Sequence, residues 1–410
     1  MYPSFRQLPA GWCALVLLVL ILAGARLAAA VDPKLDDRMI MEAKINGQPV
    51  LLQFDTGAAD LTLFRQSAER LQLHVPALPP GLKSPRGQGQ TPGIMSEPLN
   101  LQLGNRTFTT QFFVVESPTT INLDIDGALG WGPLSANVFV IAGVERAGKL
   151  RVRTAILPAA PAGVENLWQL PLRPNSDVLL LDLPGPAGHP GTMLVDTGAD
   201  NGVTLSPAKW REWKTAHPDA PTTIDIYYTP SSGFMVNTVS WARELQLGPL
   251  TLKDVPVNVD LSRETTFDAI LGLYALKRVD VIVDGRKGVA YFQPAAAVAP
   301  PYPHNRLGAV FVPHGPLLDP LVAQVIPGTP ADEAGIRDGD ILLKIGPRDV
   351  THWRSSPVGF ESVVFWTNPA GLTYSLTLMR GDSEFTTVVK LRDIIGPQPT
   401  PAGTKPTPGR

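Results

Sequence analysis

Two copies of one pattern, 141 residues apart, constrain the fold of this chain more than any other sequence feature. The copies read GQPVLLQFDTGA at residues 47–58 and GHPGTMLVDTGA at residues 188–199. The similarity continues downstream, where residues 126–130 read DGALG and residues 268–272 read DAILG. Internal similarity of this kind indicates repeated structural units. We therefore predict two lobes built on one plan.

The residue pattern within each copy indicates mainly β-structure. Apolar segments on both sides of Asn46-Gly47 predict a hairpin, and residues 107–115 are rich in Thr, Phe and Val, which favour strands. Short helices are expected at residues 67–73 and 207–214. The second of these helices has Ser206 as its expected N-cap and proline at its first helical position.

The tripeptide Asp-Thr-Gly occurs in both copies, as Asp55-Thr56-Gly57 and Asp196-Thr197-Gly198, each time after an apolar strand. A glycine lets the chain turn sharply and lets a second backbone approach closely, while the threonine hydroxyl can bond to the other copy. Two such loops that face each other would bring two carboxyl groups within hydrogen-bond distance. Because like charges so close cannot both ionise, the pair would share one proton. The ionised member could then activate water while the protonated member polarises a carbonyl.

At these residues the sequence resembles the aspartic proteases, whose pattern places two apolar residues before Asp-Thr-Gly and an apolar-apolar-Gly segment farther along the chain. The resemblance covers residues 36–294. It implies two similar β-barrel lobes in one chain, with Asp55 and Asp196 as the catalytic pair and without a cofactor or metal. It also implies supporting roles for residues around this pair: Thr56, Gly57, Gly130, Thr197, Gly198 and Gly272.

The details of the repeat are closer to the retropepsin-like proteases than to pepsin. Ala58 and Ala199 follow Asp-Thr-Gly directly, where pepsins have serine or threonine. Both halves lie in one chain, so we expect a monomeric site. Because a hydroxyl beside the pair would stabilise its charged form, its absence predicts a less acidic optimum than that of pepsin. Flap hairpins are expected at residues 82–95 and 227–236.

The first 30 residues have the pattern of a secretory signal peptide. A basic residue, Arg6, precedes the apolar run at residues 12–25, and the small residues 28–30 follow it. We therefore expect export to the bacterial periplasm or beyond the cell; the alternative is an uncleaved N-terminal anchor. The single cysteine, Cys13, excludes an internal disulfide.

A second domain type follows the repeat. Residues 321–345, LVAQVIPGTPADEAGIRDGDILLKI, closely resemble the PDZ domains of bacterial envelope proteases. The resemblance implies a small α+β domain at residues 305–395 that binds an extended or C-terminal peptide. Its candidate carboxylate-binding loop is Leu307, Gly308, Ala309 and Val310, and its peptide-facing helix is expected within residues 359–367. The alternative is a domain that serves only in packing or spacing.

The remaining boundaries follow from composition. We expect lobe 1 at residues 31–150, an inter-lobe linker at 151–168, lobe 2 at 169–294, a Pro/Ala linker at 295–304 and a Pro-rich tail at 396–410.

Composition and motif content also limit the function. The net charge of −2 and the absence of a basic run argue against nucleic acid as a partner. The six histidines show no metal-binding spacing, and the chain has no Gly-x-Ser-x-Gly motif. The sequence therefore predicts an exported aspartic endopeptidase that acts on peptides or proteins. The alternative is a catalytically inactive envelope protein that binds a partner through its lobes and PDZ domain.

Overall fold

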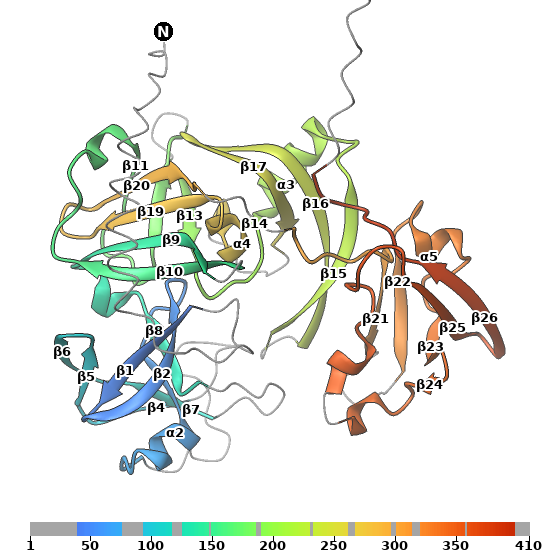
Figure 1. Ribbon diagram of the computed structural model, residues 1–410, viewed down its shortest axis with the longest axis horizontal. Coiled ribbons are helices and arrows are strands. Elements are labelled where there is room, and N and C mark those ends of the chain that lie inside the picture. Colours follow the sequence, from blue (N-terminus) through green and yellow to red (C-terminus); the bar gives the residue numbers. More distant parts are fainter. Residues whose placement is uncertain are drawn as a thin grey trace, which may run out of the picture.

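The computed structural model describes residues 39–75, 93–116, 125–146, 149–185, 190–229, 233–260, 267–296, 301–313, 320–356 and 359–397. These residues form a mainly β structure with four sheets (Figure 1). None of the helices in these ranges is long and apolar enough to cross a membrane. The predicted signal peptide, most of the first expected flap and nearly all of the Pro-rich tail lie outside the described residues.

Lobe 1 is an eight-stranded sheet in the order β4-β7-β3-β8-β2-β1-β5-β6. Its elements are β1 Ile40–Ile45, β2 Gln48–Asp55, β3 Thr62–Phe64, α2 Arg65–Arg70, β4 Gly93–Met95, β5 Leu99–Leu103, β6 Arg106–Thr110, β7 Phe113–Val115 and β8 Gly127–Gly130. Asn46 and Gly47 have φ angles of 49° and 82°, as the tight turn of the predicted β1–β2 hairpin requires. β2 runs parallel to β8, and this register sets Asp55 opposite Gly130.

Two local expectations for lobe 1 differ from the structure. The expected helix at 67–73 begins two residues earlier, as α2, and the expected strand at 107–115 is divided into β6 and β7. The chain changes neighbours at this break, since β6 pairs with β5 whereas β7 pairs with β3 and β4. The side-chain hydroxyl of Ser96 accepts a hydrogen bond from the Phe112 amide at 3.0 Å, which fixes the break.

Lobe 2 repeats this plan as a seven-stranded sheet in the order β12-β13-β18-β14-β17-β16-β15. Its elements are β12 Leu180–Leu183, β13 Gly191–Val195, β14 Val203–Leu205, α3 Pro207–Ala216, β15 Thr222–Thr229, β16 Gly233–Leu247, β17 Leu250–Val259, β18 Ala269–Leu271 and α4 Leu273–Leu276. The predicted α3 is confirmed, with the Ser206 hydroxyl accepting a hydrogen bond from the Lys209 amide at 3.3 Å. β13 runs parallel to β18, and Val195 lies opposite Leu271.

A third sheet joins the lobes, in the order β10-β9-β19-β20-β11. Its elements are β9 Val138–Arg146, β10 Lys149–Leu157, η3 Val164–Asn166, β11 Trp168–Pro171, β19 Val279–Asp284 and β20 Val289–Pro294. Residues 151–168, expected to be a linker, instead continue β10 and lead through η3 into β11. β10 is a strand because it pairs with β9, whose two faces are both apolar. Phe139 and Ile141 of β9 belong to the main core, and Val138 and Val140 belong to a second cluster.

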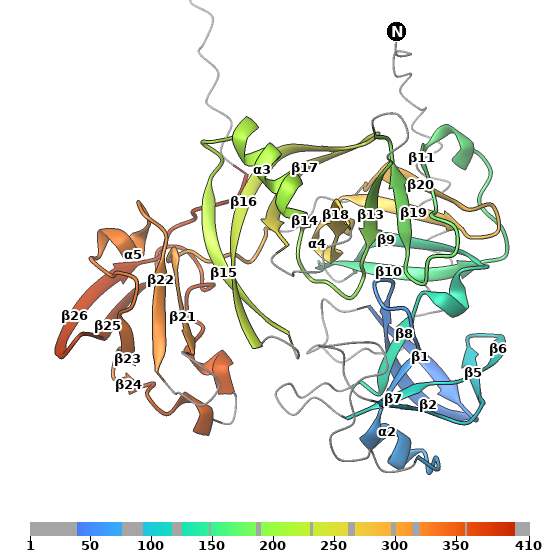
Figure 2. The ribbon, with the colours of Figure 1, turned by 180° about the vertical axis from the view of Figure 1, so that it is seen from behind.

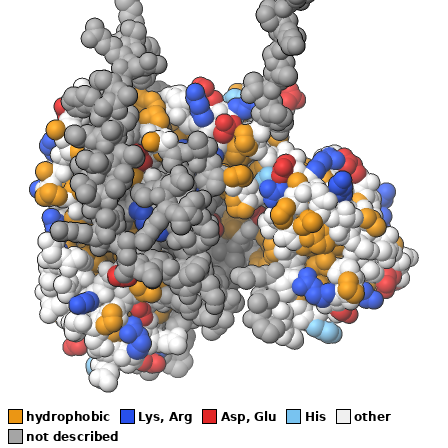
Figure 3. All heavy atoms as spheres, viewed as in Figure 1, with side chains coloured by type: hydrophobic (Ala, Val, Ile, Leu, Met, Phe, Trp, Pro, Cys, Tyr) orange, Lys and Arg blue, Asp and Glu red, His pale blue; other side chains and the backbone are white. Residues whose placement is uncertain are grey.

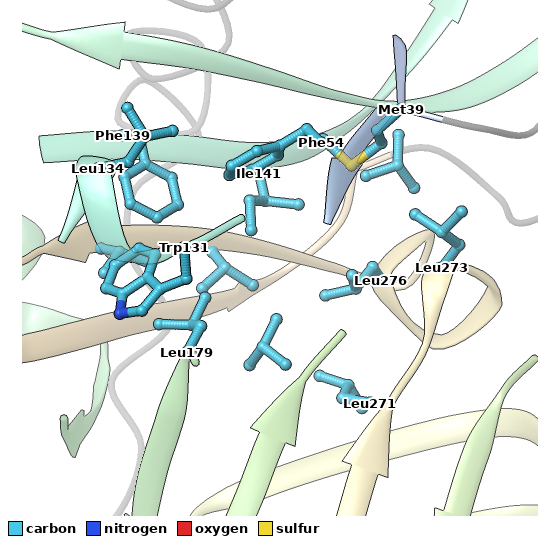
Figure 4. Close-up of a cluster of buried hydrophobic side chains, with 14 of the residues drawn as sticks. Met39, Phe54, Trp131, Leu134, Phe139, Ile141, Leu179, Leu271, Leu273 and Leu276 are labelled. Carbon is cyan, nitrogen blue, oxygen red and sulfur yellow. The ribbon is translucent and has the colours of Figure 1, made fainter. Parts of the chain in front are cut away.

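The main core runs without interruption through both lobes and the third sheet (Figure 4). Phe54 and Leu271, which directly precede Asp55 and Gly272, are fully buried in it. Phe54 packs edge-on against Phe139 of the third sheet, with ring centroids 5.9 Å apart. The strand ends that carry the Asp-Thr-Gly loops are therefore held by a packed apolar base.

The C-terminal domain is a separate sheet in the order β21-β22-β23-β25-β26, and β24 also pairs with β23. Its elements are β21 Ala309–Pro313, β22 Leu321–Val325, α5 Pro330–Glu333, β23 Ile341–Ile345, β24 Arg348–Asp349, η4 Trp353–Ser355, η5 Gly359–Val363, β25 Thr373–Arg380 and β26 Ser383–Lys390. Figures 1 and 2 both show this domain beside β15 and β16 of lobe 2, on the side away from lobe 1.

Candidate active site

Reciprocal hydrogen bonds between the two Asp-Thr-Gly loops fix them face to face. The Thr56 amide donates to the Thr197 hydroxyl at 3.0 Å, and the Thr197 amide donates to the Thr56 hydroxyl at 3.1 Å. Each hydroxyl then donates across to the opposite strand, that of Thr56 to the Val195 carbonyl at 2.5 Å and that of Thr197 to the Phe54 carbonyl at 2.7 Å. Both threonines are fully buried, so every one of these polar groups needs its partner. The predicted locking role of the threonines agrees with this geometry.

The two carboxyl groups lie over each other's glycine. A Cβ placed on Gly57 would come within 2.5 Å of the Asp196 carboxyl carbon, and one on Gly198 within 2.5 Å of the Asp55 carboxyl carbon. Any side chain at either position would therefore displace a carboxyl group. Glycine is required at both positions for this close approach.

The two carboxyl groups are half-buried and hydrogen-bonded to each other. Burial, followed by the charge of Asp196 and the hydrogen bond with Asp196, raises the pKa of Asp55 to about 7. Burial also raises the pKa of Asp196, while the same hydrogen bond and the Gly198 and Ala199 amides lower it. These amides lie 2.8 and 3.2 Å from the Asp196 Oδ1. The Gly57 and Ala58 amides lower the pKa of Asp55 in the same way, so the two carboxyl groups titrate as a pair, and it is the hydrogen bond between them that favours the proton on Asp55.

The predicted support glycines fit behind the two loops. A Cβ on Gly130 would come within 2.5 Å of the Asp60 carbonyl oxygen, and one on Gly272 within 2.6 Å of the Asn201 carbonyl oxygen. The chain that follows each glycine also holds the loop, because the Trp131 amide donates to the Ala58 carbonyl at 3.0 Å. In lobe 2 the Leu273 amide donates to the Ala199 carbonyl at 2.8 Å.

Two further aspartates form a matching pair of supports that sequence reasoning did not assign. The Asp126 carboxylate accepts a hydrogen bond from the Leu51 amide at 2.8 Å, and the Asp268 carboxylate accepts one from the Thr192 amide at 2.8 Å. These bonds tie β8 to β2 and β18 to β13, the strand pairs that carry the site. The sequence does contain a pattern that marks this role, because the two aspartates are the first residues of the repeated segments DGALG and DAILG.

Leu179 is a contact that the sequence did not indicate. Its amide donates to the Thr56 carbonyl at 2.9 Å, and its own carbonyl accepts a hydrogen bond from the Val195 amide at 3.0 Å. It thus connects the Asp-Thr-Gly loop of lobe 1 to β13, the strand that leads into the Asp-Thr-Gly loop of lobe 2. Both bonds use the backbone only, so no side-chain pattern marks this position.

An additional acidic group lies near the site in lobe 2. Burial, together with the charge of Asp200, raises the pKa of Asp225, on β15, to about 6. The charge of Asp200 also contributes to the raised pKa of Asp196. Asp200 therefore acts electrostatically on both the Asp-Thr-Gly loop of lobe 2 and the β15–β16 hairpin.

The second expected flap, residues 227–236, corresponds to the facing ends of β15 and β16, and residues 230–232 lie outside the described ranges. Tyr227 is among the more exposed large hydrophobic residues, at 37%. The hairpin leads back through β17 and β14 to β18, which ends next to Gly272.

The predicted carboxylate-binding loop of the C-terminal domain is closed in this structure. Leu307, Ala309 and Val310 have no exposed surface. The amides of Leu307 and Gly308 donate to the side-chain oxygen of Asn305 at 2.9 and 2.8 Å. The amides that would hold a ligand carboxylate are thus already satisfied within the chain.

The part of the chain that the structure describes holds no group of three His, Cys, Asp or Glu side chains arranged to bind a metal ion. On the face in Figure 3, the visible basic and acidic side chains are interspersed on the lobes and on the C-terminal domain.

Comparison with known protein families agrees with the division of the chain. An aspartyl protease family matches residues 41–132 and 186–275, which contain the two Asp-Thr-Gly loops and their support glycines. A PDZ domain family matches residues 321–354 of the C-terminal domain. No curated protein matches the chain.

Proposed function

We propose that this chain, which carries two aspartyl protease segments and a PDZ domain, is an aspartic endopeptidase that works outside the cytoplasm. One observation carries the proposal: the reciprocal threonine bonds hold the carboxyl groups of Asp55 and Asp196 face to face, each over the other loop's glycine. Like charges this close would share one proton. Export is supported by the signal-peptide pattern of residues 1–30.

The chemistry follows from the unequal protonation of the pair. The ionised Asp196 takes a proton from a bound water, whose oxygen forms a bond to the peptide carbonyl carbon. Asp55 gives its proton to the carbonyl oxygen, so the tetrahedral intermediate is a neutral diol. Asp196 then gives its proton to the peptide nitrogen as the carbon–nitrogen bond breaks, and Asp55 takes a proton back from one diol hydroxyl as the new carboxyl group forms, which restores the starting state of the pair. No covalent bond to the protein forms in this sequence.

Protein partners follow from both parts of the chain. The lobes would take a peptide or unstructured protein substrate, and a PDZ domain implies a peptide ligand. Because both Asp-Thr-Gly loops come from one chain, the proposed enzyme acts as a monomer.

The decisive experiment is cleavage of an unstructured protein by residues 31–410, beside the Asp55→Asn and Asp196→Asn variants. Either substitution should lower kcat/KM by about 10²–10⁴-fold, because each removes a proton-transfer group. Asp177→Asn, at an exposed position, is the matched control. Cleavage that survives either dyad substitution would refute the mechanism. A folded wild-type chain that cuts nothing would favour the partner-binding alternative.

The pH dependence tests the protonation state. Because the raised pKa of Asp55 is about 7, activity should persist into weakly acidic solution and fall as pH rises through about 7, where the shared proton is lost. This agrees with the less acidic optimum expected from Ala58 and Ala199. An optimum well below about pH 4 would contradict it.

A further inference from the structure

One face of the β15–β16 hairpin is part of the apolar core of the PDZ domain. Ile224 is buried in that core, and Ile226, Phe234 and Val236 pack against it. The hairpin register pairs Ile226 with Val236, and Phe234 lies two residues from Val236 on the same strand. Alternate residues of a strand point to the same face, so these side chains form one apolar surface.

The contact is centred on an aromatic cluster. The Phe234 ring lies 4.4 Å from the Phe360 ring of η5 and 6.4 Å from the Trp353 ring, centroid to centroid. Trp353 and Phe360 also pack edge-on against each other at 5.4 Å. η5 lies within residues 359–367, the segment expected to line one side of the peptide-binding groove. The hairpin therefore contacts this side of the groove.

The other side of the expected peptide-binding groove is β21, and the hairpin contacts this strand as well. Among the described strands, β21 pairs only with β22, so its second edge has no strand hydrogen-bonded to it and is the edge where a peptide could add as a strand. β15 contacts β21, and both ribbon views show the two side by side (Figures 1 and 2). The Thr223 hydroxyl donates to the Asn305 carbonyl at 2.9 Å. Asn305 is the residue whose side chain closes the carboxylate-binding loop.

A second contact ties the PDZ domain to the catalytic lobe. Tyr302, from the expected Pro/Ala linker, packs edge-on against Tyr274 of α4, with ring centroids 4.6 Å apart. The α4 helix begins directly after Gly272. Tyr302 also packs with Trp241 of β16 and Ile395. The domain is thus fixed to lobe 2 both at the hairpin and behind the catalytic loop.

We infer that the ligand seated on this PDZ domain is the chain's own β15–β16 hairpin, and that the domain positions this hairpin for substrate binding. An external peptide must displace the hairpin from β21 and η5 before it can bind there. Phe234 is then a positioning residue that acts on the substrate through the hairpin. The effect on substrate rests on the proposed peptidase function, whereas the seating of the hairpin does not.

Hydrogen exchange and kinetics on the full chain test this inference together. Phe234→Ala and Phe360→Ala remove either side of the ring contact, and Phe385→Ala removes an aromatic of the same domain that lies beneath Arg380. We expect amides of residues 233–240 to exchange about tenfold faster or more in the first two variants and to be unchanged in the third. KM should rise about fivefold with kcat and the pH profile retained.

A conservative variant and a peptide-binding measurement distinguish failure of this inference from unfolding of a variant or failure of the proposed peptidase function. Phe234→Leu, which keeps an apolar contact, should restore most of the protection and guards against general unfolding of Phe234→Ala. Unchanged exchange at 233–240 in both folded alanine variants would overturn the inference, even if the chain cleaves nothing. Tight binding of a hexapeptide that ends in three valines with a free carboxylate, without faster hairpin exchange, would also overturn it. Altered exchange with a chain that cleaves nothing would instead count against the proposed peptidase alone.

Discussion

The two lobes are nearly identical at the centre of the molecule and different at its periphery. The reciprocal threonine bonds differ by only 0.1 Å, at 3.0 and 3.1 Å, and the two aspartate supports are both 2.8 Å long. Farther out, lobe 1 adds an ion pair between Arg70 and Asp126, whereas lobe 2 extends a hairpin whose face is covered by the PDZ domain.

The comparison shows where the repeat is constrained. Each loop supplies the partner that the other loop needs, so a change on one side leaves a buried polar group unpaired on the other. The outer strands have no such reciprocal partners, and the two copies could diverge there. Substitutions made at matching positions in the two lobes can test whether the loops are equivalent.

The largest effect is expected at the two loop glycines. Gly57→Ala and Gly198→Ala each place a methyl group 2.5 Å from the opposite carboxyl carbon, so the pair must separate. We expect kcat/KM to fall by about 10²-fold or more in each variant, since small displacements of catalytic groups are costly. Gly104→Ala, at a distant turn with a φ of 60°, is the control for general destabilisation: its methyl group meets open space but strains the backbone, so it should lower stability and leave kcat/KM unchanged. A full loss in one variant with retained activity in the other would show that the loops are not equivalent.

A smaller effect is expected at the threonines. Thr56→Val and Thr197→Val each leave the amide of the other threonine buried without its acceptor. The free energy of unfolding should drop by about 2–3 kcal/mol in each, measured by urea denaturation. Because the residues share one network, the double variant should lose less than the sum of the two. Thr→Ser variants keep the hydroxyl and should lose less; additive losses would show two independent loops.

Removal of the two aspartate supports should cost slightly different amounts of unfolding free energy in the two lobes. Asp126→Ala and Asp268→Ala each remove the acceptor of a strand amide, and we expect a loss of about 1–2 kcal/mol in unfolding free energy. The loss should be somewhat larger for Asp126, which also pairs with Arg70. Thermal unfolding of the two variants measures the difference. A larger loss for Asp268 would reverse the comparison.

The smallest effect is expected at the ion pair itself. The Arg70 side chain is 48% exposed, so water and salt screen its attraction to Asp126. Arg70→Met should cost less than about 1 kcal/mol, and the cost should shrink further in high salt. Glu116, which pairs with Arg65 on the same lobe, offers a matched exposed control as Glu116→Gln. A cost that persists in high salt would mean that Arg70 has a packing role beyond its charge.

Much of the central site could be predicted because the necessary residues lie close together in sequence. Asp55, Thr56 and Gly57 form one continuous loop, and its copy recurs intact, so residue type alone indicated which groups would meet. The mainly β fold and the division into two protease segments and a PDZ domain are confirmed. The catalytic role of Asp55 and Asp196 stays a prediction until it is measured.

Features made by contacts between distant or irregular segments could not be predicted. The backbone of Leu179 bonds to both catalytic segments without any side-chain signal. Residues 151–168, expected to be a linker, contribute to the sheet between the lobes because β9 offers them a strand edge and two apolar faces.

The facing carboxyl groups, the threonine bonds between the loops and the need for glycine beside them could thus be inferred from the sequence, because they depend on residue types at fixed local spacing. Two other features depend on how the whole chain folds. The β15–β16 hairpin packs against the PDZ domain, and the side chain of Asn305 accepts a hydrogen bond from the Leu307 amide. A strand with apolar residues at alternate positions can pack against many different apolar surfaces. Which surface it buries is settled only when the whole chain folds.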